Sequence, residues 1–173
     1  MERLTLYLTR HGQTLENIAG QIQGQIPGHL SPLGLEQAGL LAEKMKDVEL
    51  DAIVCSDLAR SFDTASAVAR RKGMEPEPTP LLREMNWACY AGSPLREVDW
   101  HHLPEGVETL EELYDRAGRF LEHLRKNYAG KRVLAVGHGI FNRAVLAVLQ
   151  ARPVEGMLDI PIMENTQVLR LEC

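Results

Sequence analysis

The segment Leu4-Thr5-Leu6-Tyr7-Leu8-Thr9-Arg10-His11-Gly12 begins with alternating apolar residues and ends in a His-Gly step. This pattern predicts a strand over Arg3 to Thr9, followed by a loop. The arrangement recurs near the other end of the chain, where a strand predicted over Arg132 to Val136 runs into Gly137-His138-Gly139. Because α/β sheets place their ligands at strand ends, the two histidines mark candidate site residues.

The segments between these two strands alternate between helix-like and strand-like patterns. Ser31-Pro32 supplies an N-cap followed by proline, which predicts the start of a helix of about four turns. A short buried strand is predicted over Asp51 to Cys55, and Ser56-Asp57 is predicted to cap a second helix that ends at Gly73. We therefore expect an α/β fold, a three-layer α/β/α sandwich with a mostly parallel sheet.

The second half of the chain begins with irregular structure and then returns to regular elements. Three prolines in residues 74 to 80 predict an extended connection or edge strand. Residues 85 to 108 show little periodicity and predict a short lid insertion, within a single domain of residues 1–173. The remaining segments predict a helix after the capping box at Thr109 to Glu112, a buried helix over Ile140 to Gln150 and a last strand over Gln167 to Glu172.

Composition and charge narrow the class of function. The 173 residues carry 19 basic and 24 acidic side chains, for a net charge of −5, so no overall positive field favours nucleic acid or an anionic membrane as a partner. The longest apolar runs are far shorter than the roughly 20 residues that cross a bilayer. Three cysteines without a CxxC pair favour a reducing compartment, and we expect a cytoplasmic protein.

The motifs along the chain resemble those of the histidine phosphatase superfamily, which includes the cofactor-dependent phosphoglycerate mutases. The family fingerprint stands here as Arg10-His11-Gly12-Gln13-Thr14-Leu15-Glu16-Asn17. Further matches follow in the family's order over nearly the whole chain: Gln23-Gly24, Leu30-Ser31-Pro32, Gly34, Gln37-Ala38, Ser56-Asp57-Leu58, Arg60, Thr64-Ala65, Glu84, Gly106, Glu108 and Gly137-His138-Gly139. The resemblance implies a phosphoglycerate mutase-like fold and phosphoryl chemistry without a metal or other cofactor.

The resemblance implies that His11 is the nucleophile and forms a phosphohistidine, with Arg10, Arg60 and His138 completing the catalytic set. The residue types suit these roles, because imidazole attacks only when neutral and cationic neighbours disfavour its protonated form. Arginine forks also bind phosphate oxygens in pairs and stabilise the charge of the transition state. By the same analogy, Asn17, Gln23 and Gly139 join Arg10, Arg60 and His138 in binding the substrate.

Glu84 matches the family's acid, which would protonate the leaving oxygen and then activate water. The sequence departs from the family pattern around it, with Ala88 in place of glycine, Tyr90 in place of tryptophan and Ala91 in place of a common acidic residue. Glu108 or another carboxylate is the alternative acid. His101 and His102, which are adjacent in the lid, are interpreted as solvated residues.

Other phosphatase and nucleotide-binding classes fit poorly. Cys55 and Arg60 are one residue too close for a cysteine-based phosphatase loop, and Gly137-x-Gly139 lacks the third glycine of a dinucleotide fingerprint. The chain also has no DxD or HxH pair for a metal-dependent phosphatase.

We expect a phosphomonoester hydrolase for a small phosphorylated metabolite, with α-ribazole phosphate as one candidate. A phosphoglycerate mutase and a non-catalytic pseudoenzyme that binds phosphorylated ligands remain alternatives. The sequence leaves the physiological substrate and the oligomeric state open.

Overall fold

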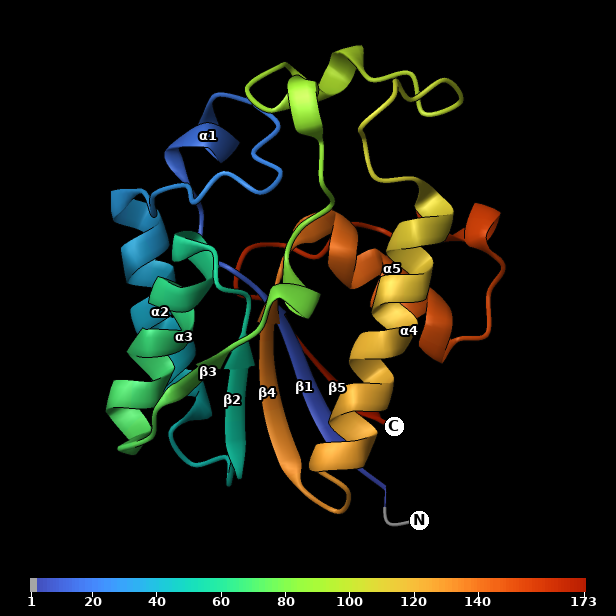
Figure 1. Cartoon of the computed structure of the whole chain (residues 1–173). Coiled ribbons are helices and arrows are strands. Elements are labelled where there is room, and N and C mark those ends of the chain that lie inside the picture. The colour runs from blue at the N-terminus through green and yellow to red at the C-terminus, as the bar shows by residue number, and fades with distance from the viewer. Residues whose placement is uncertain (1–2) are drawn as a thin grey trace.

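A computed structural model describes residues 3–173 of the chain, so Met1 and Glu2 of the predicted domain lie outside the described residues. The centre of the fold is a five-stranded sheet in the order β3-β2-β4-β1-β5 (Figure 1). Its strands are β1 (Thr5–Arg10), β2 (Ala52–Cys55), β3 (Pro76–Pro78), β4 (Arg132–Gly137) and β5 (Val168–Glu172). Four of them were predicted as strands, with boundaries that differ by one or a few residues, and β3 lies in the segment predicted to be an extended connection or edge strand.

The sheet is mostly parallel, as predicted. β4 pairs in parallel with both β1 and β2, and β2 pairs in parallel with β3, whereas β5 runs antiparallel to β1. The proline-rich β3 lies at one edge, where its missing N–H groups cost few hydrogen bonds. In the central pair, Arg10 of β1 lies opposite Gly137 of β4, so the residues that follow these two strands leave the sheet side by side.

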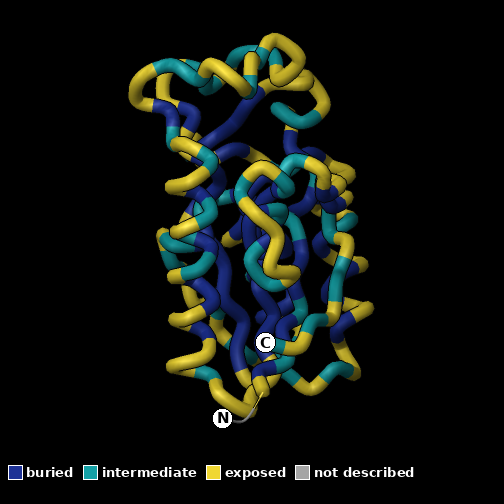
Figure 2. The backbone as a smooth tube through the Cα atoms, turned by 90° about the vertical axis from the view of Figure 1, so that its right-hand side faces the viewer, coloured by how far each residue is buried: buried dark blue, intermediate teal, exposed yellow. Residues whose placement is uncertain are grey.

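Helices cover both faces of the sheet and complete the three layers (Figure 1). One face packs against α2 (Pro32–Met45) and α3 (Ala59–Lys72), and the other against α4 (Leu110–Asn127) and α5 (Gly139–Leu149). Two clusters of buried apolar side chains fill the spaces between sheet and helices, and Figure 2 shows the buried backbone running through the middle layer. None of the helices in residues 3–173 is long and apolar enough to span a membrane.

Helix caps follow the sequence at two of three predicted positions. Ser31 accepts a hydrogen bond from the backbone N–H of Gly34, and Thr109 forms the capping box with Glu112. The predicted Ser56-Asp57 cap of α3 is wrong, because the N-cap position is Leu58, which has no side-chain cap. The Ser56 hydroxyl instead contacts His138, and Asp57 pairs with Arg83.

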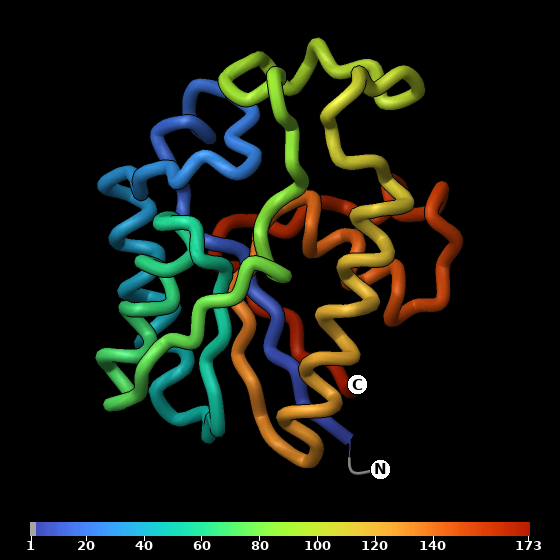
Figure 3. The backbone as a smooth tube through the Cα atoms, viewed as in Figure 1, coloured from blue at the N-terminus to red at the C-terminus, as the bar shows by residue number. Residues whose placement is uncertain are grey.

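Residues 85–108, called the 85–108 segment below, contain two short 3₁₀ turns, Ala88–Tyr90 and Leu95–Glu97. In Figure 3 this segment arches over the end of the sheet at which β1 and β4 finish, near α1 (Leu15–Ile18). Trp87 is buried, and its ring packs edge-on against Trp100, with ring centroids 5.2 Å apart. Two further 3₁₀ turns lie outside the segment, Pro80–Leu82 and Val154–Asp159.

Candidate active site

The two predicted histidines meet where the chain leaves the two central strands. After β1 the chain continues to α2 on one face of the sheet, and after β4 it enters α5 on the other face (Figure 1). Such a divergence opens a crevice at the carboxyl ends of the strands, where α/β proteins bind ligands. His11 and His138 lie there with ring centroids 5.2 Å apart, and both are buried.

The surroundings of His11 fix which ring nitrogen carries a proton. Its Nδ1 lies 2.7 Å from the carbonyl oxygen of Gly12, and because a carbonyl can only accept, Nδ1 donates. The lone pair of the neutral ring is therefore on Nε2. Gly12 is required at this turn, because a Cβ atom there would lie 2.6 Å from the carbonyl oxygen of Gly34 in α2.

Ser56 was not predicted as a partner of the second histidine. Its hydroxyl lies 2.6 Å from Nε2 of His138, while Nδ1 of His138 is buried without a hydrogen-bond partner. A signal for Ser56 was available, because it directly follows β2 and therefore lies at the same edge of the sheet as the histidines.

Burial and positive neighbours keep both histidines neutral. Desolvation lowers the pKa of His11 well below 6.5, and Arg60 and Arg10 lower it further, although the Gly12 carbonyl opposes the shift. Burial likewise lowers the pKa of His138, followed by the charges of Arg60, His11 and Arg10. His11 therefore holds an available lone pair at neutral pH.

Arg60 is a buried residue of α3 and not a helix-surface ion-pairing residue. Its side chain is 1% exposed and donates to the carbonyl groups of Gly24, Ile26 and Pro27. Burial lowers its pKa to about 10, so the guanidinium keeps its charge at neutral pH. Its Nε atom has no hydrogen-bond partner.

Arg10 lies at the end of β1 and contacts the start of α5. Its Nη1 donates to the carbonyl group of Met163 at 3.0 Å, whereas its Nε is buried and unpartnered. A Cβ atom at Gly139 would lie 3.4 Å from this Nε, an ordinary van der Waals contact, and 3.2 Å from Cγ2 of Ile162, so the guanidinium packs directly against the helix start.

Glu84 is 8% exposed and lines the same cavity as His11, whereas His138 does not line that cavity and lies behind it, next to the His11 ring. One carboxylate oxygen accepts from the backbone N–H groups of Met85 and Phe141, and the other accepts from that of Ile140. Two of these donors belong to the first turn of α5, where the helix dipole favours negative charge. Glu108, the alternative acid, does not line this cavity and pairs instead with Arg116.

The predicted amide residues also reach the cavity. Gln23 is buried, with an unpartnered side-chain oxygen. Asn17 uses its side-chain oxygen to accept from the backbone N–H of Thr14 at the start of α1, which leaves its amide nitrogen for a ligand. Asn165, which no motif signalled, donates to the His11 carbonyl group and lies beside Asn17.

The cavity beside His11 is small, about 80 Å³, and is lined by Arg10, His11, Asn17, Gln21, Ile22, Gln23, Gly24, Arg60, Glu84, Trp87, Leu95, Gly139, Ile140 and Ile162. Pockets for drug-sized ligands hold about 300–1,000 Å³, so this one suits a single compact group. A neighbouring hollow of about 360 Å³ shares Arg10, Asn17, Gln21 and Leu95 with it and adds Gln13, Gly20 and Asn165. Within residues 3–173, no group of three or more His, Cys, Asp or Glu side chains is arranged to hold a metal ion.

Comparisons with known proteins identify the family of the chain. The family model for the histidine phosphatase superfamily, branch 1, matches residues 6–173. The chain is 33% identical to the "Probable phosphoglycerate mutase GpmB" of Yersinia pestis (strain Pestoides F) over 165 residues, which cover 87% of this chain and 76% of that protein.

Solved structures of phosphatases share the fold. A mycobacterial glucosyl-3-phosphoglycerate phosphatase superposes with a TM-score of 0.87 at 27% identity, covering 99% of this chain and 91% of its own. The α-ribazole phosphatase of Shigella flexneri superposes with a TM-score of 0.84 at 28% identity, covering 92% and 86%.

A buried imidazole pair lies beside two guanidinium groups at the carboxyl ends of the central strands, an arrangement whose chemistry suits a phosphoryl group. The chain belongs to the histidine phosphatase superfamily, branch 1, and is a phosphatase of that superfamily.

Proposed function

We propose that this protein hydrolyses a small phosphomonoester through a phosphohistidine at His11. The observation that carries the proposal is the buried pair of neutral imidazoles, 5.2 Å apart, next to the unpartnered Nε atoms of Arg10 and Arg60. Buried cationic donors without partners favour an anion with several acceptor oxygens, and a phosphoryl group provides them in a volume that suits the cavity.

In the first step, the Nε2 lone pair of His11 attacks phosphorus, the P–N bond forms and the ester P–O bond breaks. Arg10, Arg60 and His138 stabilise the charge on the phosphoryl oxygens. Glu84 gives a proton to the leaving oxygen, which departs as an alcohol, and the three backbone donors and the start of α5 stabilise the carboxylate that this transfer leaves.

In the second step, Glu84 takes a proton from water, whose oxygen attacks phosphorus while the P–N bond breaks. Inorganic phosphate leaves, and the proton is again on Glu84 while His11 has recovered its lone pair. The same carboxyl group therefore serves as acid and then as base.

The hollow next to the phosphoryl cavity supports a neutral, hydroxyl-bearing leaving group. It is lined by the amide side chains of Gln13, Asn17, Gln21 and Asn165, together with apolar Leu95. Amides both donate to and accept from hydroxyl groups. Among the residues that line the two cavities, Arg10 and Arg60 are the cations, and both serve the phosphoryl group.

A ribose-like leaving group with an apolar base, as in α-ribazole phosphate, fits this lining, and the structural likeness to the Shigella flexneri α-ribazole phosphatase supports it. The curated mutase relative favours phosphoglycerate mutase activity as the second candidate. The cytoplasm remains our proposed location, on the odd number of cysteines without a CxxC pair.

The test is phosphate release from p-nitrophenyl phosphate in the presence of EDTA, with His11→Ala beside the wild type. We expect turnover by the wild type and a loss of at least about a thousand-fold in the variant, because the nucleophile is gone. Acid quenching during turnover removes an acid-labile phosphoryl group, so alkaline quenching is used to trap it on His11. His101→Ala, an exposed residue of the 85–108 segment, is the matched control.

Each alternative has its own outcome. Equal activity of wild type and His11→Ala contradicts the mechanism. Interconversion of 3- and 2-phosphoglycerate faster than phosphate release establishes the mutase. Binding of vanadate, which a solved structure of the mycobacterial phosphatase also contains as VO3, without turnover of any ester establishes the pseudoenzyme.

A further inference from the structure

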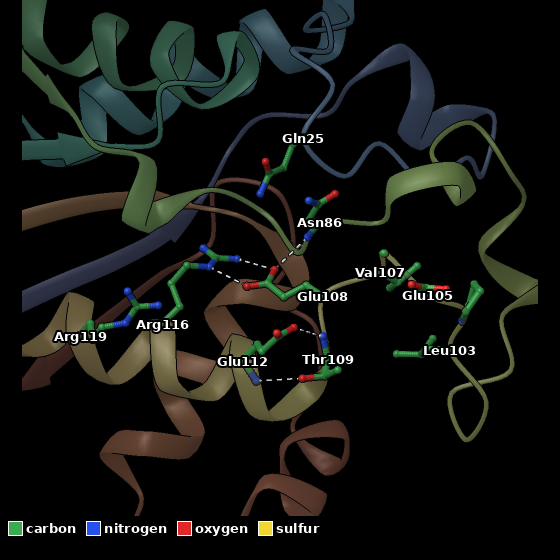
Figure 4. Close-up of a pocket in the computed structure, with 12 residues that line it drawn as sticks. Gln25, Asn86, Leu103, Glu105, Val107, Glu108, Thr109, Glu112, Arg116 and Arg119 are labelled. Atoms are coloured by element: carbon green, nitrogen blue, oxygen red, sulfur yellow. Dashed lines mark hydrogen bonds and ion pairs between the residues drawn. The ribbon is translucent and has the colours of Figure 1, made fainter.

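A third, wider hollow of about 730 Å³ is lined by Asn86, two residues after Glu84, and by an ion pair between Arg116 and Glu108 (Figure 4). Arg116 of α4 and Glu108 form two N–H···O contacts of 2.8 Å, and their side chains are only 11% and 12% exposed. An ion pair this far from water must have its remaining donors and acceptors satisfied, so the other hydrogen-bond partners of the two side chains show which backbone the pair holds in place.

The remaining N–H groups of Arg116 donate hydrogen bonds to backbone carbonyl groups around Glu84. Nη1 donates to the carbonyl groups of Leu81 and Arg83, and Nη2 donates to that of Glu84 at 3.3 Å. All five N–H groups of the guanidinium are therefore used, and three contacts hold the main chain just before and at the acid.

Glu108 holds the main chain after the acid. Its Oε2 accepts from the backbone N–H of Asn86 at 2.9 Å, and its own backbone N–H donates to the Asn86 carbonyl group at 2.8 Å (Figure 4). Asn86 and Glu108 stand near the two ends of the 85–108 segment, so the ion pair also joins these ends to each other.

Arg116 contacts the other support of the acid as well. Its guanidinium lies 4.6 Å from the ring centroid of Phe141, whose backbone N–H donates to the Glu84 carboxylate. The two side chains of the ion pair thus hold the backbone on both sides of the acid, and Arg116 also contacts the helix turn that binds the acid's carboxylate.

We propose that the Arg116–Glu108 pair is a positioning device for Glu84, which aligns the acid with the leaving oxygen without touching substrate. This inference rests on the proposed function. Misplacement by about 1 Å can cost about a hundred-fold in rate, so loss of the pair is expected to reduce proton transfer specifically.

The experiment compares kcat/KM for two esters, because this ratio reports ester cleavage and not the later hydrolysis of phosphohistidine. p-Nitrophenolate leaves without a proton, whereas the alcohol of glycerol 2-phosphate needs one. We expect Arg116→Met to lower kcat/KM about ten-fold or more for glycerol 2-phosphate and by no more than about two-fold for p-nitrophenyl phosphate, the same selectivity as Glu84→Gln. In the double variant, Arg116→Met should add nothing to the loss caused by Glu84→Gln.

Arg119→Met is the matched control, since Arg119 lines the same hollow but pairs with Asp115 on the exposed surface of α4. It should leave both ratios unchanged. Should Arg116→Met not fold, Glu108→Gln and Arg116→Lys test the same split. Equal losses for the two esters, or full additivity with Glu84→Gln, overturn the inference, whereas absence of turnover in the wild type overturns the proposed function instead.

Discussion

The crevice between β1 and β4 is formed by the ends of regular strands, whereas the 85–108 segment above it is irregular. The crevice takes His11 and His138 from the ends of two strands whose register is fixed by the sheet, and both side chains are buried. The 85–108 segment has two 3₁₀ turns in place of strands or helices, and most of its residues are partly or fully exposed. The phosphoryl-binding part is thus rigidly framed by the sheet, and the part above it depends on local contacts.

Glu84 lies at the junction of these two regions, just before the 85–108 segment. Its carboxylate is bound by the start of α5, on the sheet side, while its backbone is held by Arg116 from α4. Glu84 shows that helices can position a residue that lies next to an irregular segment, provided that buried donors hydrogen-bond to its backbone.

The largest expected effect is a difference in activity between removing an arginine from the crevice and removing one from the 85–108 segment. Arg10→Met should lower kcat/KM for p-nitrophenyl phosphate about a hundred-fold, because it removes a buried donor to the phosphoryl oxygens. Arg96→Met, which removes an exposed guanidinium of the 85–108 segment, should change it by less than about two-fold, as surface charges contribute little. Steady-state kinetics at constant ionic strength provide the measurement, and equal losses in the two variants would contradict the distinction.

The next effect concerns stability against acid. Burial lowers the pKa of His11 and His138 in the folded protein, so below pH 6.5 the unfolded chain takes up protons that the folded protein does not. Their contribution to the free energy of unfolding is complete above pH 6.5 and falls by about 1.4 kcal/mol per pH unit for each histidine as the pH drops below that value.

Urea unfolding of wild type and His138→Gln at pH 7.5 and pH 5.5 measures this loss, which should be smaller by about 1.4 kcal/mol over the whole range in the variant, because the unfolded histidine is only half protonated at pH 6.5. His101→Gln should leave the loss unchanged, because His101 is exposed in the folded protein as it is in the unfolded chain. A wild-type loss that persists in His138→Gln would show that other groups cause it.

The smallest effect tests the backbone of the 85–108 segment. Ala88 has a φ of 45°, in the left-handed region, which costs a non-glycine residue about 1–2 kcal/mol. Ala88→Gly should therefore raise the free energy of unfolding by about 0.5–1 kcal/mol after the entropic cost of glycine. Ala91→Gly, at a φ of −57°, should lower it by a similar amount. Chemical denaturation measures both changes, and a loss of stability in Ala88→Gly would refute the strain.

Periodicity and turn chemistry sufficed to predict the strands and the four long helices, because each depends on residues close together in the sequence, whereas the short helix α1 was not predicted. They also predicted that His11 and His138 lie near each other, since both follow strands of one sheet. The Ser56 contact with His138 was missed although Ser56 also directly follows a strand of this sheet, whereas the Asn165 contact with the His11 carbonyl group joins segments that no local pattern relates. The same reason hid the Arg116 contacts to the loop of Glu84.

The strand pairing of Arg10 with Gly137 also has a consequence for how the enzyme folds. Parallel pairing between opposite ends of a chain carries a high loop-closure cost and tends to form slowly. During refolding from denaturant, catalysis should consequently return together with the completed central sheet, so a folding intermediate that lacks the β1–β4 ladder has helices but no working catalyst.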